Sequence, residues 1–106
     1  MTKPSSIERS VAISRSKLHP NPWNPNKTKP RQQAAIAESL AAYGQVLELV
    51  VRPHPTLPGE YQIIDGEHRY NELTDTVYAT VLHDFKDADA KKLTIILNET
   101  NGKNMI

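Results

Sequence analysis

Four prolines between residues 20 and 30 place the strongest constraint on how this chain can fold. They lie in the stretch Leu18–Pro30, which reads L-H-P-N-P-W-N-P-N-K-T-K-P. Because proline fixes φ and lacks a backbone N–H, this stretch can form neither a regular helix nor a central strand. We therefore expect an extended loop here, with Trp23 packing it against the rest of the domain.

Regular elements are predicted on both sides of this loop. The alternating residues Arg9–Ser14 predict a short strand before it. After it, residues 31–43 combine alanines with an apolar stripe and predict a helix that ends at Gly44, a residue that readily takes positive φ. Next, residues 46–53 and 61–64 predict a hairpin, whose first strand carries apolar side chains on both faces.

The second half of the chain continues this alternation of strands and helices. It contains a predicted short helix at 67–73, a strand at 77–82, and a helix from about Ala88 to Asn98 with Asp87 as its N-cap and Leu93, Ile96 and Leu97 on one face. The resulting fold class is a small α+β domain with a mixed sheet and flanking helices. We expect it to span residues 9–101, between a flexible N-terminus at 1–8 and a polar tail at 102–106.

Composition excludes several classes of function. The chain has 106 residues and no cysteine, which excludes disulfides, thiolate catalysis and cysteine metal sites. We expect a cytoplasmic protein, since no apolar run is long enough for a membrane span or a signal peptide. With a formal net charge of +1, the whole chain has little general attraction for DNA.

The most informative motif is the turn Asp65-Gly66-Glu67-His68-Arg69. A strand is predicted to run into a glycine turn from which a helix starts at once, and the first amides of a helix favour an anion. Gly66 lets an anion approach the backbone, while His68 and Arg69 add side-chain donors. The turn therefore predicts a phosphate-binding site, although a surface helix with a charged first turn explains the same residues.

The order of these motifs resembles the ParB/sulfiredoxin superfamily, and in particular the ParB-like N-terminal ("ParB nuclease") domain of phage or plasmid type. That domain has an Asn-Pro pair in a loop, a Gly-x-x-x-Pro-Leu-Val-Val-Arg strand motif and a Gly-Glu-Arg-Arg turn. The matching segments here are Asn24-Pro25-Asn26, Gly44–Arg52 and Asp65–Tyr70. The resemblance implies a ParB/sulfiredoxin-like fold over nearly the whole chain.

Sulfiredoxin has Gly-Cys-His-Arg-Tyr where this chain has Gly66-Glu67-His68-Arg69-Tyr70. The His-Arg pair resembles the phosphate-binding residues of that reductase. Glu67 replaces the cysteine, and the chain contains no other thiol. A sulfiredoxin-type reductase is therefore excluded.

The resemblance also implies a ligand and further site residues. It implies a nucleoside triphosphate, ATP or CTP, with Mg²⁺, bound by Gly66, His68 and Arg69. Additional cofactor-binding candidates are Asn24 and Lys27 from the proline-rich loop and Gln45 after the first helix, although these residues also suit turns and caps. Asn98 alone remains of the family's Glu-Asn-x-x-Arg motif, so Asn98 and Glu67 are the metal candidates, with Glu99 the nearest other carboxylate.

Three kinds of function remain open. The first is a nucleotide-binding domain of a DNA-associated protein of the partition, phage or plasmid type. Such a domain would contact DNA through a missing or separate module, and a homodimer is an open alternative for its assembly. The second is an enzyme, a nucleotide hydrolase, kinase or nuclease, with Glu67 and Asp65 as catalytic residues. The third is a degenerate protein-interaction domain that retains only the fold.

Overall fold

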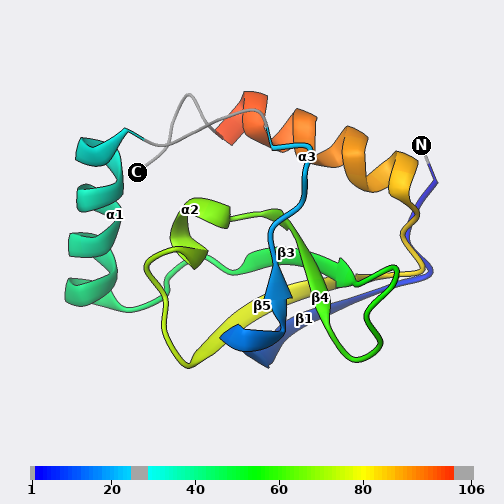
Figure 1. The fold of residues 1–106 in the computed structure, drawn as a ribbon, viewed down its shortest axis with the longest axis horizontal. Helices are drawn as coiled ribbons and strands as arrows, with labels where there is room; N and C mark the ends of the chain where they lie inside the picture. The colour runs from blue at the N-terminus through cyan, green and yellow to red at the C-terminus, as the bar shows by residue number, and fades with distance from the viewer. Residues whose placement is uncertain (1, 25–28, 102–106) are drawn as a thin grey trace.

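A five-stranded mixed sheet lies at the centre of the computed structural model, which describes residues 2–24 and 29–101, the last three through their backbone alone (Figure 1). The strand order is β1-β5-β3-β4-β2. β1 pairs antiparallel with β5, β5 parallel with β3, β3 antiparallel with β4, and β4 parallel with β2. The strands are β1 (Ser6–Ser14), β2 (Leu18–His19), β3 (Leu49–Pro53), β4 (Tyr61–Asp65) and β5 (Thr76–His83).

Helices cover the sheet unequally. The long helix α3 (Asp87–Asn101) runs across the sheet, whereas α1 (Pro30–Tyr43) stands to one side and the short α2 (Glu67–Tyr70) lies between α1 and the sheet (Figure 1). A 3-10 turn, η1 (Arg15–Lys17), connects β1 and β2. These elements confirm the predicted α+β class with a mixed sheet.

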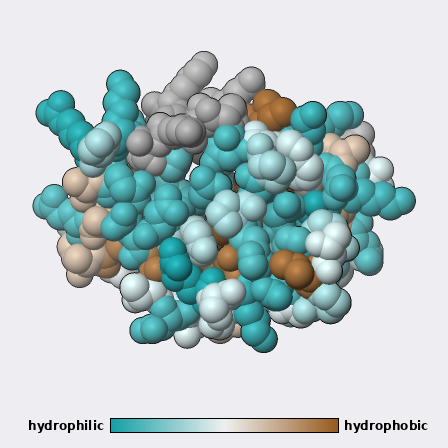
Figure 2. All heavy atoms as spheres, viewed as in Figure 1, coloured by the Kyte–Doolittle hydropathy of each residue, from teal (hydrophilic) through white to brown (hydrophobic). Residues whose placement is uncertain are grey.

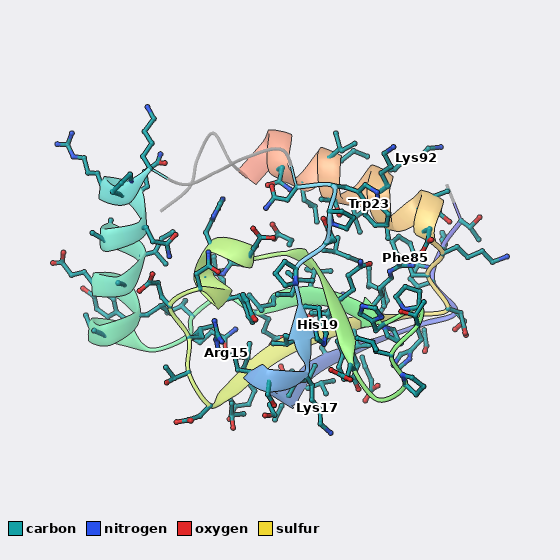
Figure 3. All side chains as sticks on the ribbon, in the orientation of Figure 1. Arg15, Lys17, His19, Trp23, Phe85 and Lys92 are labelled. Atoms are coloured by element: carbon teal, nitrogen blue, oxygen red, sulfur yellow. The ribbon has the colours of Figure 1, made fainter. Side chains whose placement is uncertain are left out.

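Apolar residues pack on both faces of the central strands. On one face, Leu49 and Val51 of β3 join a cluster whose other buried members are Ile13, Leu18, Ile63, Val77, Ala79 and Val81. On the other face, Ile64 of β4 packs with Leu82, Phe85 and Ala90 beneath α3, and Trp23 closes this cluster from the proline-rich loop (Figure 3). The expected packing role of Trp23 is therefore confirmed.

The structure corrects the predicted start of the first hairpin strand. β3 begins at Leu49 rather than at residue 46, and the side chains of Val46 and Leu47 are 74% and 59% exposed. The apolar residues in the segment 46–53 predicted a strand buried on both faces, but only the part from Leu49 onward lies in the sheet. The segment before Leu49 is held instead by the side chain of Gln45, which is hydrogen-bonded to the backbone of Tyr78.

Several smaller predictions also change. Asp87 is the first residue of α3 rather than its N-cap, since the Ala90 amide donates to the Lys86 carbonyl and the Asp87 carboxylate binds Arg52 at 2.7 Å. Ile96 is 43% exposed, so it does not share the buried face of Leu93 and Leu97. Other differences concern the bounds of elements. β1 begins at Ser6, inside the segment 1–8 that was predicted to be flexible, because residues 6–8 pair with β5, and α3 continues to Asn101. In addition, α2 ends at residue 70, and β2 interrupts the predicted loop.

No helix in the described part of the chain is both long and apolar enough to cross a membrane. The face shown in Figure 2 is mostly hydrophilic, with apolar residues in separate spots.

Candidate functional site

A β-bulge precedes the glycine turn. Val50 pairs with Asp65 and Val51 pairs with Ile63, so β4 holds one residue, Ile64, more than β3 between these pairs. Bulges bend a strand and redirect the side chains that follow, and they are frequent beside functional sites. The bulge therefore sets the direction in which Asp65 and the following turn leave the sheet.

Gly66 connects β4 to α2 in a left-handed conformation, with φ of 104°. A Cβ at this position would lie 2.3 Å from Leu49 Cδ2 and 3.0 Å from the Arg69 Nη2 atom. Glycine is thus required both by the backbone angle and by the close approach of Leu49. The prediction of a strand, a glycine turn and an immediate helix is confirmed, and the structure adds this packing reason for the glycine.

The guanidinium of Arg69 is partly buried beside the turn, with a side-chain exposure of 21%. Its Nη2 atom donates to the Glu48 carbonyl at 3.4 Å and lies 3.9 Å from Asp65 Oδ2. Its buried Nε atom has no hydrogen-bond partner within the described residues. Burial lowers the pKa of Arg69, while the Asp65 carboxylate opposes this shift. An anion that contacts the exposed part of this guanidinium would supply a charged acceptor in addition to the weak contacts with Glu48 and Asp65.

Gln33 connects α1 to this turn. Its Nε2 atom donates to the His68 carbonyl at 2.8 Å and to Glu72 Oε2 at 2.7 Å. The side chains of Glu67 and His68 are half-buried on the same short helix. Gln33 was not predicted as a site residue, because nothing in the sequence around it indicates a partner 35 positions away.

A second arginine packs beneath α2. The Arg15 guanidinium lies 4.2 Å from the centre of the Tyr70 ring, and its Nε donates to the Tyr70 carbonyl at 3.2 Å (Figure 3). The Tyr70 hydroxyl in turn donates to the Leu18 carbonyl at 3.3 Å. These contacts fix the end of α2 against η1 and β2, and Arg15 was likewise not among the predicted site residues.

A buried asparagine holds the start of the loop that contains the candidate Asn24. Asn21 donates from Nδ2 to the Ile63 carbonyl and to Thr94 Oγ1, and its Oδ1 accepts from the Trp23 amide at 2.9 Å. These bonds hold the start of the proline-rich loop between β4 and α3, and Asn24 follows this turn as a half-buried residue. Lys27 lies outside the described residues.

The two remaining candidates, Gln45 and Asn98, form hydrogen bonds with the protein backbone. The Gln45 Nε2 atom donates to the carbonyls of Leu47 and Tyr78, and its Oε1 accepts from the Tyr78 amide at 2.8 Å. The Asn98 Nδ2 atom donates to the Thr94 carbonyl one helical turn earlier, at 2.7 Å. Within the described residues, no group of three or more histidine, aspartate or glutamate side chains has the arrangement of a metal site.

A pocket of about 510 Å³ lies at the other end of β3, lined in part by Arg52, His83 and Phe85. The buried Arg52 guanidinium is already bonded to Gln62, the Phe85 carbonyl and Asp87. The Arg52 guanidinium is therefore fully engaged in hydrogen bonds within the protein, whereas the Nε atom of Arg69 has no partner among the described residues.

The sheet order, the bulged strand and the glycine turn define a ParB/sulfiredoxin-type α+β domain. The ParB N-terminal domain family matches residues 1–101, and the chain belongs to this family. A comparison with curated proteins finds no match.

Solved structures give the same fold. ParB from Caulobacter crescentus complexed with CTP-gamma-S is 28% identical, with a TM-score of 0.76 over 87% of this chain and 53% of that chain. The same ParB complexed to the centromeric parS site is 28% identical, with a TM-score of 0.70 over 84% of this chain and 46% of that chain. A free serine kinase in complex with AMP is 22% identical, with a TM-score of 0.60 over 82% of this chain and 36% of that chain. The chain thus spans about half the length of the ParB structures.

Proposed function

We propose that this domain binds a nucleoside triphosphate, with the phosphates held at the Gly66–Arg69 turn. The observation that carries the proposal is the partly buried Arg69 guanidinium, whose Nε has no partner in the described part of the chain. It lies beside a glycine turn that opens a helix, where backbone amides favour an anion. The complex of Caulobacter crescentus ParB with CTP-gamma-S supports a nucleotide as the ligand.

The biological setting that we propose is a DNA-associated protein of the partition, phage or plasmid type. The complex of the similar ParB with parS supports this setting. Because this chain covers 46% of that C-terminally truncated ParB chain, we propose that DNA contacts come from a separate module.

Mg²⁺ is proposed as the accompanying ion. Magnesium is commonly held by one or two protein oxygens together with the phosphates of the substrate, so it requires no complete protein site. Glu67 and Asn98 are the proposed protein ligands, since both carry side-chain oxygens. The nucleotide is accordingly expected to bind more tightly with Mg²⁺ than with EDTA.

Isothermal titration with CTP and with ATP, in the presence and absence of Mg²⁺, tests the proposal. Arg69→Ala should weaken binding by about 1.5–3 kcal/mol, as for a lost hydrogen bond to a charged group. Arg31→Ala is the matched control, because Arg31 is exposed on α1 and should leave affinity unchanged. Equal affinities of the wild type and Arg69→Ala would remove Arg69 from the site.

A further inference from the structure

Glu48 lies directly beneath the candidate site and joins three elements of the sheet. Its Oε1 accepts hydrogen bonds from the Ser10 amide at 2.9 Å and from Thr80 Oγ1 at 3.0 Å. Its Oε2 accepts from the Ser10 hydroxyl. The carboxylate therefore fastens the chain just before β3 to both β1 and β5.

The bond to Ser10 closes a second β-bulge. Between the pairs Glu8–Val81 and Val11–Ala79, β1 holds one more residue than β5. Ser10 takes a left-handed conformation there, with φ of 55°, which is costly for a residue with a Cβ. Glu48 accepts both from the backbone and from the side chain of this strained residue, so it stabilises the bulge.

The backbone of the same residue supports the candidate site. The Glu48 carbonyl accepts from Arg69 Nη2 at 3.4 Å, and the next residue, Leu49, supplies the methyl group that leaves no room for a Cβ at Gly66. Any movement of Glu48 and Leu49 would consequently displace both Gly66 and Arg69. The related strand motif has proline where this chain has Glu48, so the carboxylate tether distinguishes this chain from that motif.

We propose that Glu48 is a positioning residue for the Gly66–Arg69 turn, holding the backbone on which Arg69 and Gly66 rest. This inference rests on the proposed function only for its consequence, which is tighter nucleotide binding. The Ser10 hydrogen bonds also lower the pKa of the Glu48 carboxyl.

Hydrogen exchange on the nitrogen-15-labelled protein tests the positioning role without any nucleotide. In Glu48→Ala, the amides of Tyr70 and Leu73, which donate to the Gly66 and Arg69 carbonyls, should exchange at least about fivefold faster, because local opening becomes easier. Amides in the β3–β4 pairing near Arg52 should keep their rates. Glu48→Gln retains one acceptor oxygen and should give a smaller effect, which also serves if the alanine variant does not fold. Glu38→Gln, at an exposed site on α1, is the matched control. Unchanged exchange of the Tyr70 and Leu73 amides in both Glu48 variants would overturn the proposal.

A double-mutant cycle with CTP and Mg²⁺ tests the consequence for binding. Glu48→Ala should weaken binding about fivefold in the wild-type background and less than about twofold in the Arg69→Ala background, because the two residues act through one contact. Equal losses in both backgrounds would contradict a role exerted through Arg69. If exchange of the Tyr70 and Leu73 amides changes while the wild type binds no nucleotide, the proposed function fails and the positioning role stands.

Discussion

Gly66 meets two separate structural requirements, and a matched pair of substitutions distinguishes them. Gly66→Ala must accept both a φ of 104° and a Cβ placed 2.3 Å from Leu49. Gly59→Ala must accept only a φ of 79°, since nothing lies within 4 Å of its Cβ. We expect a loss of about 1–2 kcal/mol for Gly59→Ala from backbone strain, and about 1–3 kcal/mol more for Gly66→Ala from overpacking. Urea unfolding measures both, and equal losses would show that Leu49 moves aside at no cost.

Glu67 allows a test of the catalytic interpretation at the same scale. A carboxylate in the first turn of a helix is stabilised by the helix dipole by about 0.3–1 kcal/mol, which is a sufficient structural reason for its presence. If Glu67 also acts in catalysis, Glu67→Gln should lower nucleotide turnover at least tenfold, roughly 1.4 kcal/mol in the barrier, while most binding is kept. Melting temperature and turnover are measured together on wild type and variant. A lower melting temperature with unchanged turnover would leave Glu67 a purely structural residue.

Individual residues were predictable where the contacts are local in sequence. The turn at Gly66, with Arg69 on the short helix that follows, was predictable from a strand, a glycine and a helix start within a few positions. Gln33, Arg15 and Glu48 were not predictable, because their partners lie 35, 55 and 38 positions away. Glutamine, arginine and glutamate are also common at solvent-exposed positions, so their residue types alone do not indicate these contacts.

Among the elements, the turn of the β3–β4 hairpin depends on a neutral histidine. His54 Nδ1 accepts from the amides of Thr56 and Leu57 at 3.2 and 3.1 Å. Burial, followed by the nearby His19, lowers the pKa of His54. Its folded pKa is thus below the unfolded value of about 6.5, so its contribution is complete above pH 6.5 and is lost as pH falls through the folded pKa.

The His54→Asn variant should therefore lose less stability than the wild type between pH 7 and pH 5. Urea denaturation of both proteins across this range provides the measurement. An identical slope for wild type and His54→Asn would show that the turn does not depend on the neutral ring.

Elements were predictable where pattern and length agreed, and less so where tertiary contacts decide. The alanine-rich α1 and the strands β4 and β5 lie close to their predicted positions. The apolar residues Val46 and Leu47 led to a predicted start of β3 that is too early. At this point the Gln45 side chain, rather than a strand pairing, is hydrogen-bonded to the backbone of Tyr78. β2 was missed because two residues before a proline form a strand only when β4 lies alongside.

For the whole molecule, the charge balance predicts weak DNA binding by this chain alone. The formal net charge of +1 gives little counterion release, which supplies most of the nonspecific affinity for DNA. We expect dissociation constants on the order of micromolar or weaker for random duplexes at moderate salt. Fluorescence anisotropy measures this, and nanomolar affinity that persists at higher salt would contradict the need for a separate DNA-binding module.

The central claim is that nucleotide phosphates bind at the Gly66–Arg69 turn, and an amide chemical-shift map of the labelled protein tests it most directly. CTP with Mg²⁺ is titrated beside cytidine, which has the same base and no phosphate. We expect the largest shifts with CTP on the amides of Gly66, Glu67, His68 and Arg69, and no change of these amides with cytidine. Shifts confined to the pocket around Arg52 and Asp87, or no shifts at millimolar CTP, would contradict it.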